Sequence, residues 1–352
     1  MAKARNIALA SGLVWVLASS PLSADDSITV AMPFSGTYSL IGEQFMDGLE
    51  LSPAADDFLF ERVDTACRPE EGASGSEQIP ETADVVVGFI CVDALDAALQ
   101  TKSLQDKTLL IPFTPPLSFA PTVDQSAHPQ MIHLASPTGS AALALAEYLV
   151  DNEPETPIAI IDDGTLIGRA FAAEVEIQLR DRNVEPVYTT NYRPQLNNQV
   201  ALARLLARSG AQITVVGGDA FDVSRIDAAI DVIDADMVFA GGPLLQPTMD
   251  EFLLPEGTLV SALPNAAEIE YGEHVFSDAE EALVPVEGFF HWGFLTGEML
   301  THLRNRTLSA GLYQTSFGSL MFDDGGRLST NLYRVSTVEN VDPASDLEAE
   351  PE

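Results

Sequence analysis

Residues 83–99 read ADVVVGFICVDALDAAL, which is an apolar run, a glycine, and an amphipathic stretch that begins with an acidic residue. An apolar run without polar alternation is typical of a strand that is buried on both faces of a parallel sheet. Residues 211–226, AQITVVGGDAFDVSRI, repeat the same order of features. The repeat predicts two similar α/β lobes, each built around a parallel sheet.

Short apolar runs also alternate with longer helical patterns on both sides of these stretches. Residues 39–55, for example, place Leu40, Phe45 and Leu49 roughly on one helical face. Strands alternating with helices imply parallel sheets with right-handed crossovers, so the expected fold class is α/β. The further strands are predicted at 27–34, 58–64, 108–114, 157–163, 184–190 and 236–242.

The N-terminal residues 1–24 have the three parts of a secretory signal peptide. Lys3 and Arg5 supply positive charge, 7–17 form a short apolar run, and Ala24 ends a stretch of small residues. The alternative, a membrane anchor, is disfavoured because the apolar run is well short of the roughly 20 residues that a spanning helix needs. We expect cleavage after Ala24 and export of a soluble protein without membrane insertion.

Cys67 and Cys91 are the only two cysteines in the 352 residues. They could form a disulfide, contribute to a metal site, or remain two unrelated thiols. In an oxidising compartment a single cysteine pair is most simply a disulfide. A metal site needs more ligands, and the sequence has neither a CxxC motif nor a histidine at ligand spacing. An unstrained bond that closes a loop of this size would contribute about 3 kcal/mol to stability.

The composition is strongly acidic, with 53 Asp and Glu residues against 17 Lys and Arg and a formal net charge of −36 at pH 7. Such a surface repels nucleic-acid phosphates and anionic lipids, so neither is expected as a partner. Solubility is the simplest interpretation of this charge, and net charge alone does not show that a ligand is cationic. Residues 341–352 are acidic and nearly devoid of large apolar side chains, which predicts a disordered tail.

The sequence lacks the motifs of common catalytic and cofactor sites. It contains no P-loop, dinucleotide fingerprint, HExxH or GxSxG motif. His133 and His291 are interpreted as packed or surface imidazoles, and 323–326, DDGG, as a tight turn instead of a calcium loop. We therefore expect no enzyme activity, no cofactor and no metal. A two-lobed α/β protein of this kind suggests a binding site in the cleft between the lobes, at the carboxyl ends of the strands.

Several segments together carry a family resemblance: ITVAMPFSGTYSLIGEQFMDGLEL (28–51), DTACRP (64–69), VVGFIC (86–91), LLIPFTPPLSFAPT (109–122), PIAIIDDGTLIG (157–168) and QITVVGGD (212–219). In order and spacing they resemble the periplasmic leucine/isoleucine/valine-binding (branched-chain amino acid-binding) proteins, which are type I solute-binding proteins of ABC importers. The resemblance covers about residues 27–335. It implies two Rossmann-like lobes with parallel sheets, joined by a three-strand hinge.

The resemblance also implies what the protein does. The two cysteines match the positions of the family's disulfide. The function implied is a periplasmic protein that captures a small polar ligand, an amino acid or a related compound, and delivers it to ABC permease subunits. The protein is expected to be a monomer. The alternative is a sensor of the same fold that reports a ligand to a receptor or regulator.

Three crossings between the lobes follow from the resemblance. We expect them near 133–136, 261–264 and 319–322. Lobe one would then comprise 27–134 and 264–319, and lobe two 135–262 and 320–340.

In the resemblance, the ligand-binding positions correspond to Tyr38, Val92, Thr114, Leu117, Ser118, Ile167 and Asp219. Val92 stands where amino-acid binders of the family usually have a serine that holds the ligand carboxylate, and Ile167 replaces an aromatic residue. The usual glutamate that accepts the ligand ammonium falls near Gly241 and is absent. Asp219 could supply a replacement charge, but both Ser118 and Asp219 could instead only cap turns or helices.

An α-amino acid needs a carboxylate cradle and an ammonium acceptor, and burying either charge unpaired costs several kcal/mol. Both devices are altered in this sequence. We therefore expect leucine and valine to bind weakly, with dissociation constants above about 100 µM.

Overall fold

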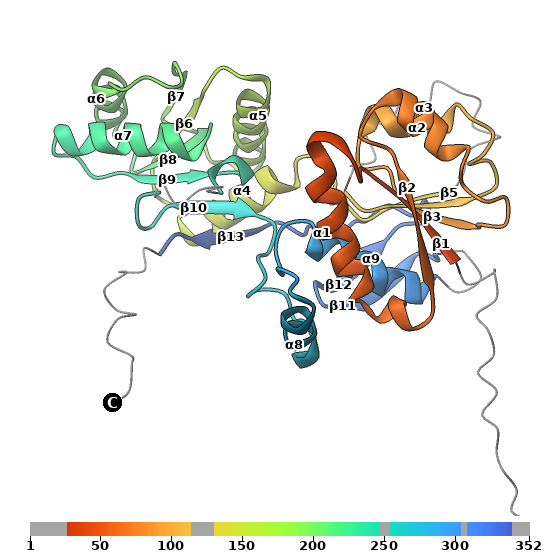
Figure 1. The fold of residues 1–352 in the computed structure, drawn as a ribbon. Helices are drawn as coiled ribbons and strands as arrows, with labels where there is room; N and C mark the ends of the chain where they lie inside the picture. The colour runs from red at the N-terminus through yellow and green to blue at the C-terminus, as the bar shows by residue number, and fades with distance from the viewer. Residues whose placement is uncertain (1–26, 114–129, 247–253, 304–307, 340–352) are drawn as a thin grey trace, which may run out of the picture.

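The structure, a computed structural model, describes residues 27–113, 130–246, 254–303 and 308–339 (Figure 1). The expected signal peptide at 1–24, the acidic tail at 341–352 and the loop residues Thr114, Leu117 and Ser118 lie outside this part of the chain. The described residues form two α/β lobes, each with its own sheet and its own apolar core. No helix within these ranges is long and apolar enough to cross a membrane.

The first lobe is built around a five-stranded parallel sheet of order β2-β1-β3-β4-β5. The stretch at 83–99 forms a fully buried strand followed by a helix, as its sequence predicts. The strands are β1 (Ser27–Met32), β2 (Leu59–Asp64), β3 (Val85–Gly88), β4 (Thr108–Ile111) and β5 (Gln130–His133). The helices between them are α1 (Ser39–Glu50), α2 (Pro69–Ser76) and α3 (Val92–Leu99).

The second lobe contains a six-stranded sheet of order β13-β10-β9-β8-β6-β7, in which β13 runs antiparallel to β10 and the other pairs are parallel. The repeat at 211–226 forms β8 and α7, so the prediction of two similar α/β lobes is confirmed. The strands are β6 (Ile158–Asp162), β7 (Tyr188–Asn191), β8 (Ile213–Gly217), β9 (Val238–Gly241), β10 (Leu259–Ala262) and β13 (Arg334–Thr337). The helices are α4 (Ser140–Asn152), α5 (Leu166–Asp181), α6 (Val200–Ser209) and α7 (Ala220–Val232).

The later part of the chain returns to the first lobe and completes it. It forms α8 (Glu273–Ala282), α9 (Phe290–His302) and a hairpin of β11 (Gly311–Thr315) and β12 (Gly318–Phe322). Helix α9 lies against α1 (Figure 1), and the close approach depends on glycines. A Cβ atom on Gly48 would meet the Phe290 carbonyl, and one on Gly293 would meet the Phe45 carbonyl. This contact fixes α9 and the side chains at its N-terminal end.

Two of the connections between the lobes follow the end of a strand. β5 of the first lobe ends at His133, and α4 of the second lobe begins at Ser140. β10 of the second lobe ends at Ala262, and Leu263 packs against the first lobe's core. The chain therefore changes lobe between neighbouring elements at both points.

The third connection lies later than the expected position near 319–322. Leu320, Phe322 and Leu332 all belong to the first lobe's core, and β13 then joins the second sheet beside β10. The reason is the hairpin, in which alternate residues of β12 are buried and keep that strand in the first lobe. We propose that the first lobe comprises 27–134 with 263–333, and the second 135–262 with 334–339.

A disulfide joins Cys67 and Cys91, whose Cα atoms are 5.3 Å apart. Cys67 lies between β2 and α2, and Cys91 is the N-cap residue of α3. The bond therefore ties together two loops at the carboxyl edge of the first sheet. The pairing expected from the sequence is present in the structure.

Candidate functional site

The loops at the carboxyl ends of parallel strands are the usual position of a ligand site in α/β proteins. In the first lobe such loops hold Tyr38, which ends a short 3-10 helix (Gly36–Tyr38) after β1, and Val92, the first residue of α3. Their side chains are 50% and 41% exposed. Both residues are therefore open to a ligand, but Val92 has no side-chain donor for a carboxylate.

In the second lobe the corresponding loops hold Ile167 and Asp219. Ile167 lies in the first turn of α5 and is exposed, and it lines two depressions on this lobe. Asp219 is the N-cap residue of α7, and its carboxylate accepts a hydrogen bond from the backbone N–H of Asp222 at 2.9 Å. The capping role considered for Asp219 is thus present, whereas a role in ligand binding is left as a proposal.

A buried carboxyl group supports this edge of the second lobe. Asp222 accepts hydrogen bonds from the backbone N–H of Gln195 at 2.7 Å and from the hydroxyl of Tyr192 at 3.4 Å. Burial raises the pKa of Asp222, and the neighbouring charge of Asp219 adds to the increase. A Cβ atom on Gly218 would meet the Tyr192 hydroxyl, so glycine allows the loop to pack on the network.

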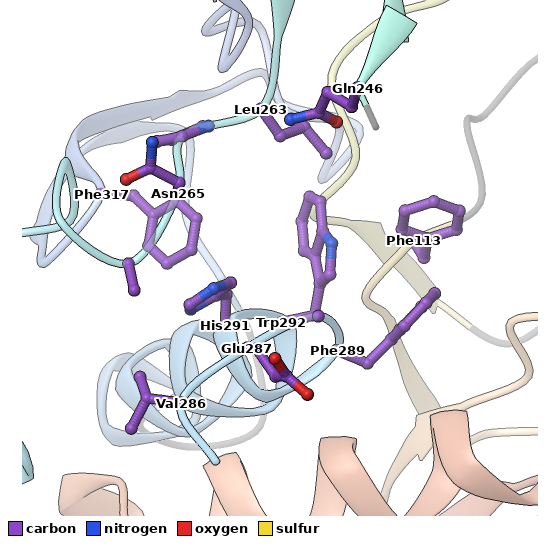
Figure 2. Close-up of a pocket in the computed structure, with 13 residues that line it drawn as sticks. Phe113, Gln246, Leu263, Asn265, Val286, Glu287, Phe289, His291, Trp292 and Phe317 are labelled. Carbon is purple, nitrogen blue, oxygen red and sulfur yellow. The ribbon is translucent and has the colours of Figure 1, made fainter. Parts of the chain in front are cut away.

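A cavity of about 510 Å³ lies where the connection after β10 meets the first lobe (Figure 2). Its walls come from separated parts of the chain, including Phe113 shortly after β4, the start of α9 and the β11–β12 turn. We call it the aromatic cavity. It is lined by Phe113, Gln246, Leu263, Pro264, Asn265, Ala266, Val286, Glu287, Gly288, Phe289, His291, Trp292 and Phe317.

Four aromatic rings form much of the wall. The centroid of the Phe113 ring lies 5.2 Å from that of Phe289 and 5.5 Å from that of Trp292. Trp292 lies 6.3 Å from Phe317 by the same measure. Figure 2 shows Phe289 and Trp292 extending from the start of α9, with Leu263 on the other side of the cavity. Phe113 is 40% exposed, so its ring surface is accessible to a ligand.

The polar groups of the cavity are few and mostly uncharged. They are the side-chain amides of Gln246 and Asn265, the exposed carboxylate of Glu287 and the imidazole of His291. Nδ1 of His291 lies 2.5 Å from the Tyr271 hydroxyl. Burial lowers the pKa of His291 to about 4, so the imidazole is uncharged at neutral pH.

Glu298 of α9 supports the far wall of the cavity. Its carboxylate accepts hydrogen bonds from the backbone N–H of Ser316 at 2.9 Å and from the Ser316 hydroxyl at 2.8 Å. Burial raises the pKa of Glu298, and the bonds from Ser316 oppose this increase. Because Ser316 directly precedes Phe317, the interaction anchors that ring to the same helix that carries Trp292.

The lining of the aromatic cavity offers mainly apolar contacts and a few hydrogen-bonding groups. Within the described ranges, no group of three or more His, Cys, Asp or Glu side chains is placed to hold a metal ion. The rings offer dispersion and edge-to-face contacts, and the two amides offer neutral hydrogen bonds.

The sequence patterns do not point to this cavity. The four described candidates from the resemblance lie on other loops, and none of them lines it. The available signal was the run FFHWGF at 289–294, where aromatic residues are unusually dense. The run alone does not distinguish the buried Phe290 and Phe294 from Phe289, which faces the cavity.

Comparisons with known proteins agree with this architecture. A family model described as "Periplasmic binding protein" matches residues 27–256. The Leu/Ile/Val-binding protein homolog 3 of Brucella melitensis is 22% identical over 205 residues, and this match spans 55% of each chain. The match therefore covers about half the length of that relative.

Solved structures share the fold over nearly the whole chain. A branched-chain amino acid ABC-type transporter protein from Rhodopseudomonas palustris CGA009 has a TM-score of 0.70 at 14% identity, covering 91% of this chain and 93% of the other. A solute-binding protein from Rhodopseudomonas palustris BisB5, in complex with 3,4-dihydroxybenzoic acid, has a TM-score of 0.61 at 11% identity, covering 90% and 93%. Because the family model covers well over half of the sequence, and both lobes are shared with these structures, the chain belongs to the periplasmic binding protein family and has its two-lobed type I fold.

Proposed function

We propose that this protein is an extracytoplasmic solute-binding protein, which captures a small ligand between its lobes and delivers it to the permease of an ABC transporter. The observation that carries the proposal is the aromatic cavity, because first-lobe side chains meet the interlobe connection and Gln246 of the second lobe there. Family membership supports it, since members are binding proteins and not enzymes. One relative is named for leucine, isoleucine and valine, and one structural neighbour holds an aromatic acid.

Capture would require the lobes to close about their connections. Apolar side chains are exposed at the strand-end loops of both lobes: Tyr38 and Phe113 in the first, and Leu166, Ile167 and Leu244 in the second. Full burial of one such side chain contributes about 1.5–3 kcal/mol. Closure that removes part of this surface from water would therefore favour the ligand-bound state.

The residues expected to touch the ligand remain part of this proposal. Tyr38 and Val92 of the first lobe and Ile167 and Asp219 of the second do not line the aromatic cavity. They would touch the part of a ligand that extends out of this cavity. Since Val92 supplies no hydroxyl, a ligand carboxylate would depend on backbone N–H groups at the start of α3. Leucine and valine should accordingly bind with dissociation constants above about 100 µM.

We also propose that the protein works in the periplasm after removal of residues 1–24. The positive n-region, the short apolar run and the small residues before Asp25 support this proposal. Mass spectrometry of protein from a periplasmic extract should find Asp25 at the N-terminus. Retention of residues 1–24 in the mature protein would contradict it.

A thermal-shift screen across amino acids, amides, alcohols, amines and aromatic acids tests the proposed function. A ligand at 100 times its dissociation constant adds about 2.7 kcal/mol to stability, which is easily measured. Small-angle X-ray scattering with the best compound should show a decrease in the radius of gyration as the lobes close. If no compound stabilises the protein, or if binding leaves the dimensions unchanged, the proposed function is wrong.

A further inference from the structure

The aromatic cavity combines exposed ring surfaces with a lining that contains an acidic side chain and lacks basic ones. Among its lining residues as described, there is no lysine or arginine. Glu287 is the acidic side chain among these lining residues, and burial keeps His291 uncharged at neutral pH. A carboxylate that contacted the lining side chains would therefore meet one acidic group and no basic one. The guanidinium of Arg334 lies outside the lining and donates a hydrogen bond to the Phe317 carbonyl at 3.4 Å.

The rings favour a flat apolar partner. Phe113 and Trp292 meet edge to face with an interplanar angle of 84°, and Phe113 and Phe289 are tilted by 53°. An added ring can continue such packing, since aromatic pairs prefer edge-to-face and offset arrangements. A volume of about 510 Å³ is in the range of small-molecule sites, and it leaves room for a single-ring compound.

The start of α9 is the place where an anion could still be attracted, because the N-terminal end of a helix carries a partial positive charge. Glu287 lies just before α9 begins at Phe290, so its carboxylate already offsets that charge. The amides of Gln246 and Asn265 can bond to an alcohol or an amine as well as to an acid. Neither feature gives a carboxylate an advantage.

We infer that the aromatic cavity takes an aromatic ligand without a carboxylate, and that it binds an arylalkyl amine or alcohol, such as benzylamine or benzyl alcohol, in preference to an aromatic acid or an α-amino acid. The inference rests on the proposed function, because it names the ligand class of the same cleft. The amine is the best candidate, since ring faces and the Glu287 carboxylate both attract a cation.

Four single compounds test this inference: benzylamine, benzyl alcohol, benzoate and leucine. Calorimetry on the mature chain at pH 7 should give benzylamine and benzyl alcohol dissociation constants at least tenfold lower than those of benzoate and leucine. Trp292 provides an independent signal, because the sequence from residue 25 onwards contains this tryptophan alone. Its emission should change as the amine or the alcohol binds.

Two variants locate the site. Phe113→Ala should weaken benzyl alcohol binding at least fivefold, whereas Phe221→Ala, on α7 of the second lobe, should not. Glu287→Gln should reduce the preference for benzylamine over benzoate at least fivefold, whereas Glu281→Gln, exposed on α8, should leave this ratio unchanged.

Several outcomes would overturn the inference. Benzoate or leucine binding as tightly as the amine would do so, as would binding that leaves Trp292 emission unchanged. If none of the four compounds binds, but another compound in the thermal-shift screen closes the lobes, the inference fails and the proposed function stands. If no compound in that screen binds, both fail.

Discussion

The two lobes present different chemistry at the ends of their strands. On the first lobe, the rings of Phe113, Phe289 and Trp292 line a cavity with few charges. On the second lobe, the exposed carboxylate of Asp219 follows the buried Gly217 and Gly218 at the end of β8. Under the proposed function, the first lobe would select the shape of the ligand and the second would supply polar recognition. Both would then operate together only when the lobes close.

The two surfaces are also supported differently. The rings depend on helix–helix contact between α1 and α9, and a disulfide holds the neighbouring loops. The second-lobe edge depends on a helix cap and the buried Asp222 network. Packing and covalent bonds usually contribute more to stability than a single cap, so changes in the first lobe should have the larger effects.

The largest effect is expected at the contact between α1 and α9. Gly48→Ala places a Cβ atom against the Phe290 carbonyl, which cannot move without shifting α9. The free energy of unfolding should fall by about 3 kcal/mol, the upper end for overpacking. Urea unfolding measures this change. Leu40→Ala, at an exposed position of the same helix, is the control and should change stability by about 0.5 kcal/mol or less. Equal effects of the two changes would show that the glycine contact does not support the cavity.

Removal of the disulfide should have an effect of about the same size. The double variant Cys67→Ser, Cys91→Ser should lower the free energy of unfolding by about 2–4 kcal/mol. Ligand binding should survive, because neither cysteine lines the aromatic cavity. Thiol titration of the denatured, unreduced wild-type protein should find no free thiol. Two titratable thiols per chain would contradict the bond, and loss of binding in the double variant would show that the loops need it.

A substitution at Asp219 separates capping from ligand recognition in the second lobe. Asp219→Ala removes the acceptor for the Asp222 N–H and should cost about 1 kcal/mol of stability. Asp219→Asn keeps a good cap and should leave stability nearly unchanged. If Asp219 faces the ligand, the Asn variant should still weaken an amine and leave a neutral ligand unaffected, as calorimetry would show. Unchanged amine binding in both variants would show that Asp219 caps α7 and does not contact the ligand.

A further effect concerns the pH dependence of the first lobe. The pKa of His291 falls from an ordinary value of 6.5 to about 4 in the folded protein. The unfolded chain therefore binds more protons between these values. The stability that this produces is present above about pH 6.5 and is lost as the pH falls toward 4. His291→Gln should reduce the drop in melting temperature between pH 7 and pH 5. An identical drop in the variant would show that other groups cause it.

The sequence predicted the elements of the fold because their signals are local. The apolar run and acidic helix start at 83–99 and the similar pattern at 211–226 each lie within one short window, and both appear in the structure as expected. The sequence predicted the third crossing too early in the chain. The short apolar pattern of β12 would be the same in either lobe, so the pattern does not show to which lobe this strand belongs. Only the burial of Leu320 and Phe322 in the first core decides its lobe.

The candidate site was less predictable because its walls are distant in sequence. Phe113, Asn265, Trp292 and Phe317 come together through the return of the chain to the first lobe. No spacing rule links them. The resemblance predicted a site at the strand-end loops, where the structure shows Asp219 as a helix cap and its contact with a ligand remains a proposal. A site whose residues meet only through tertiary packing can be identified from the structure but not from a local sequence pattern.

The return of the chain to the first lobe also determines the order in which the protein can fold during synthesis. The first core begins with Ile28 but includes Leu332, so it cannot be complete until almost the entire chain has emerged. At about 5–20 residues per second, the interval between these residues is on the order of 15–60 seconds. The second lobe's buried clusters lie mostly between Ala142 and Ala262, so most of this lobe can fold first. The lobe that starts the chain is thus the last to finish, and a nascent first lobe would be the part that most needs a chaperone.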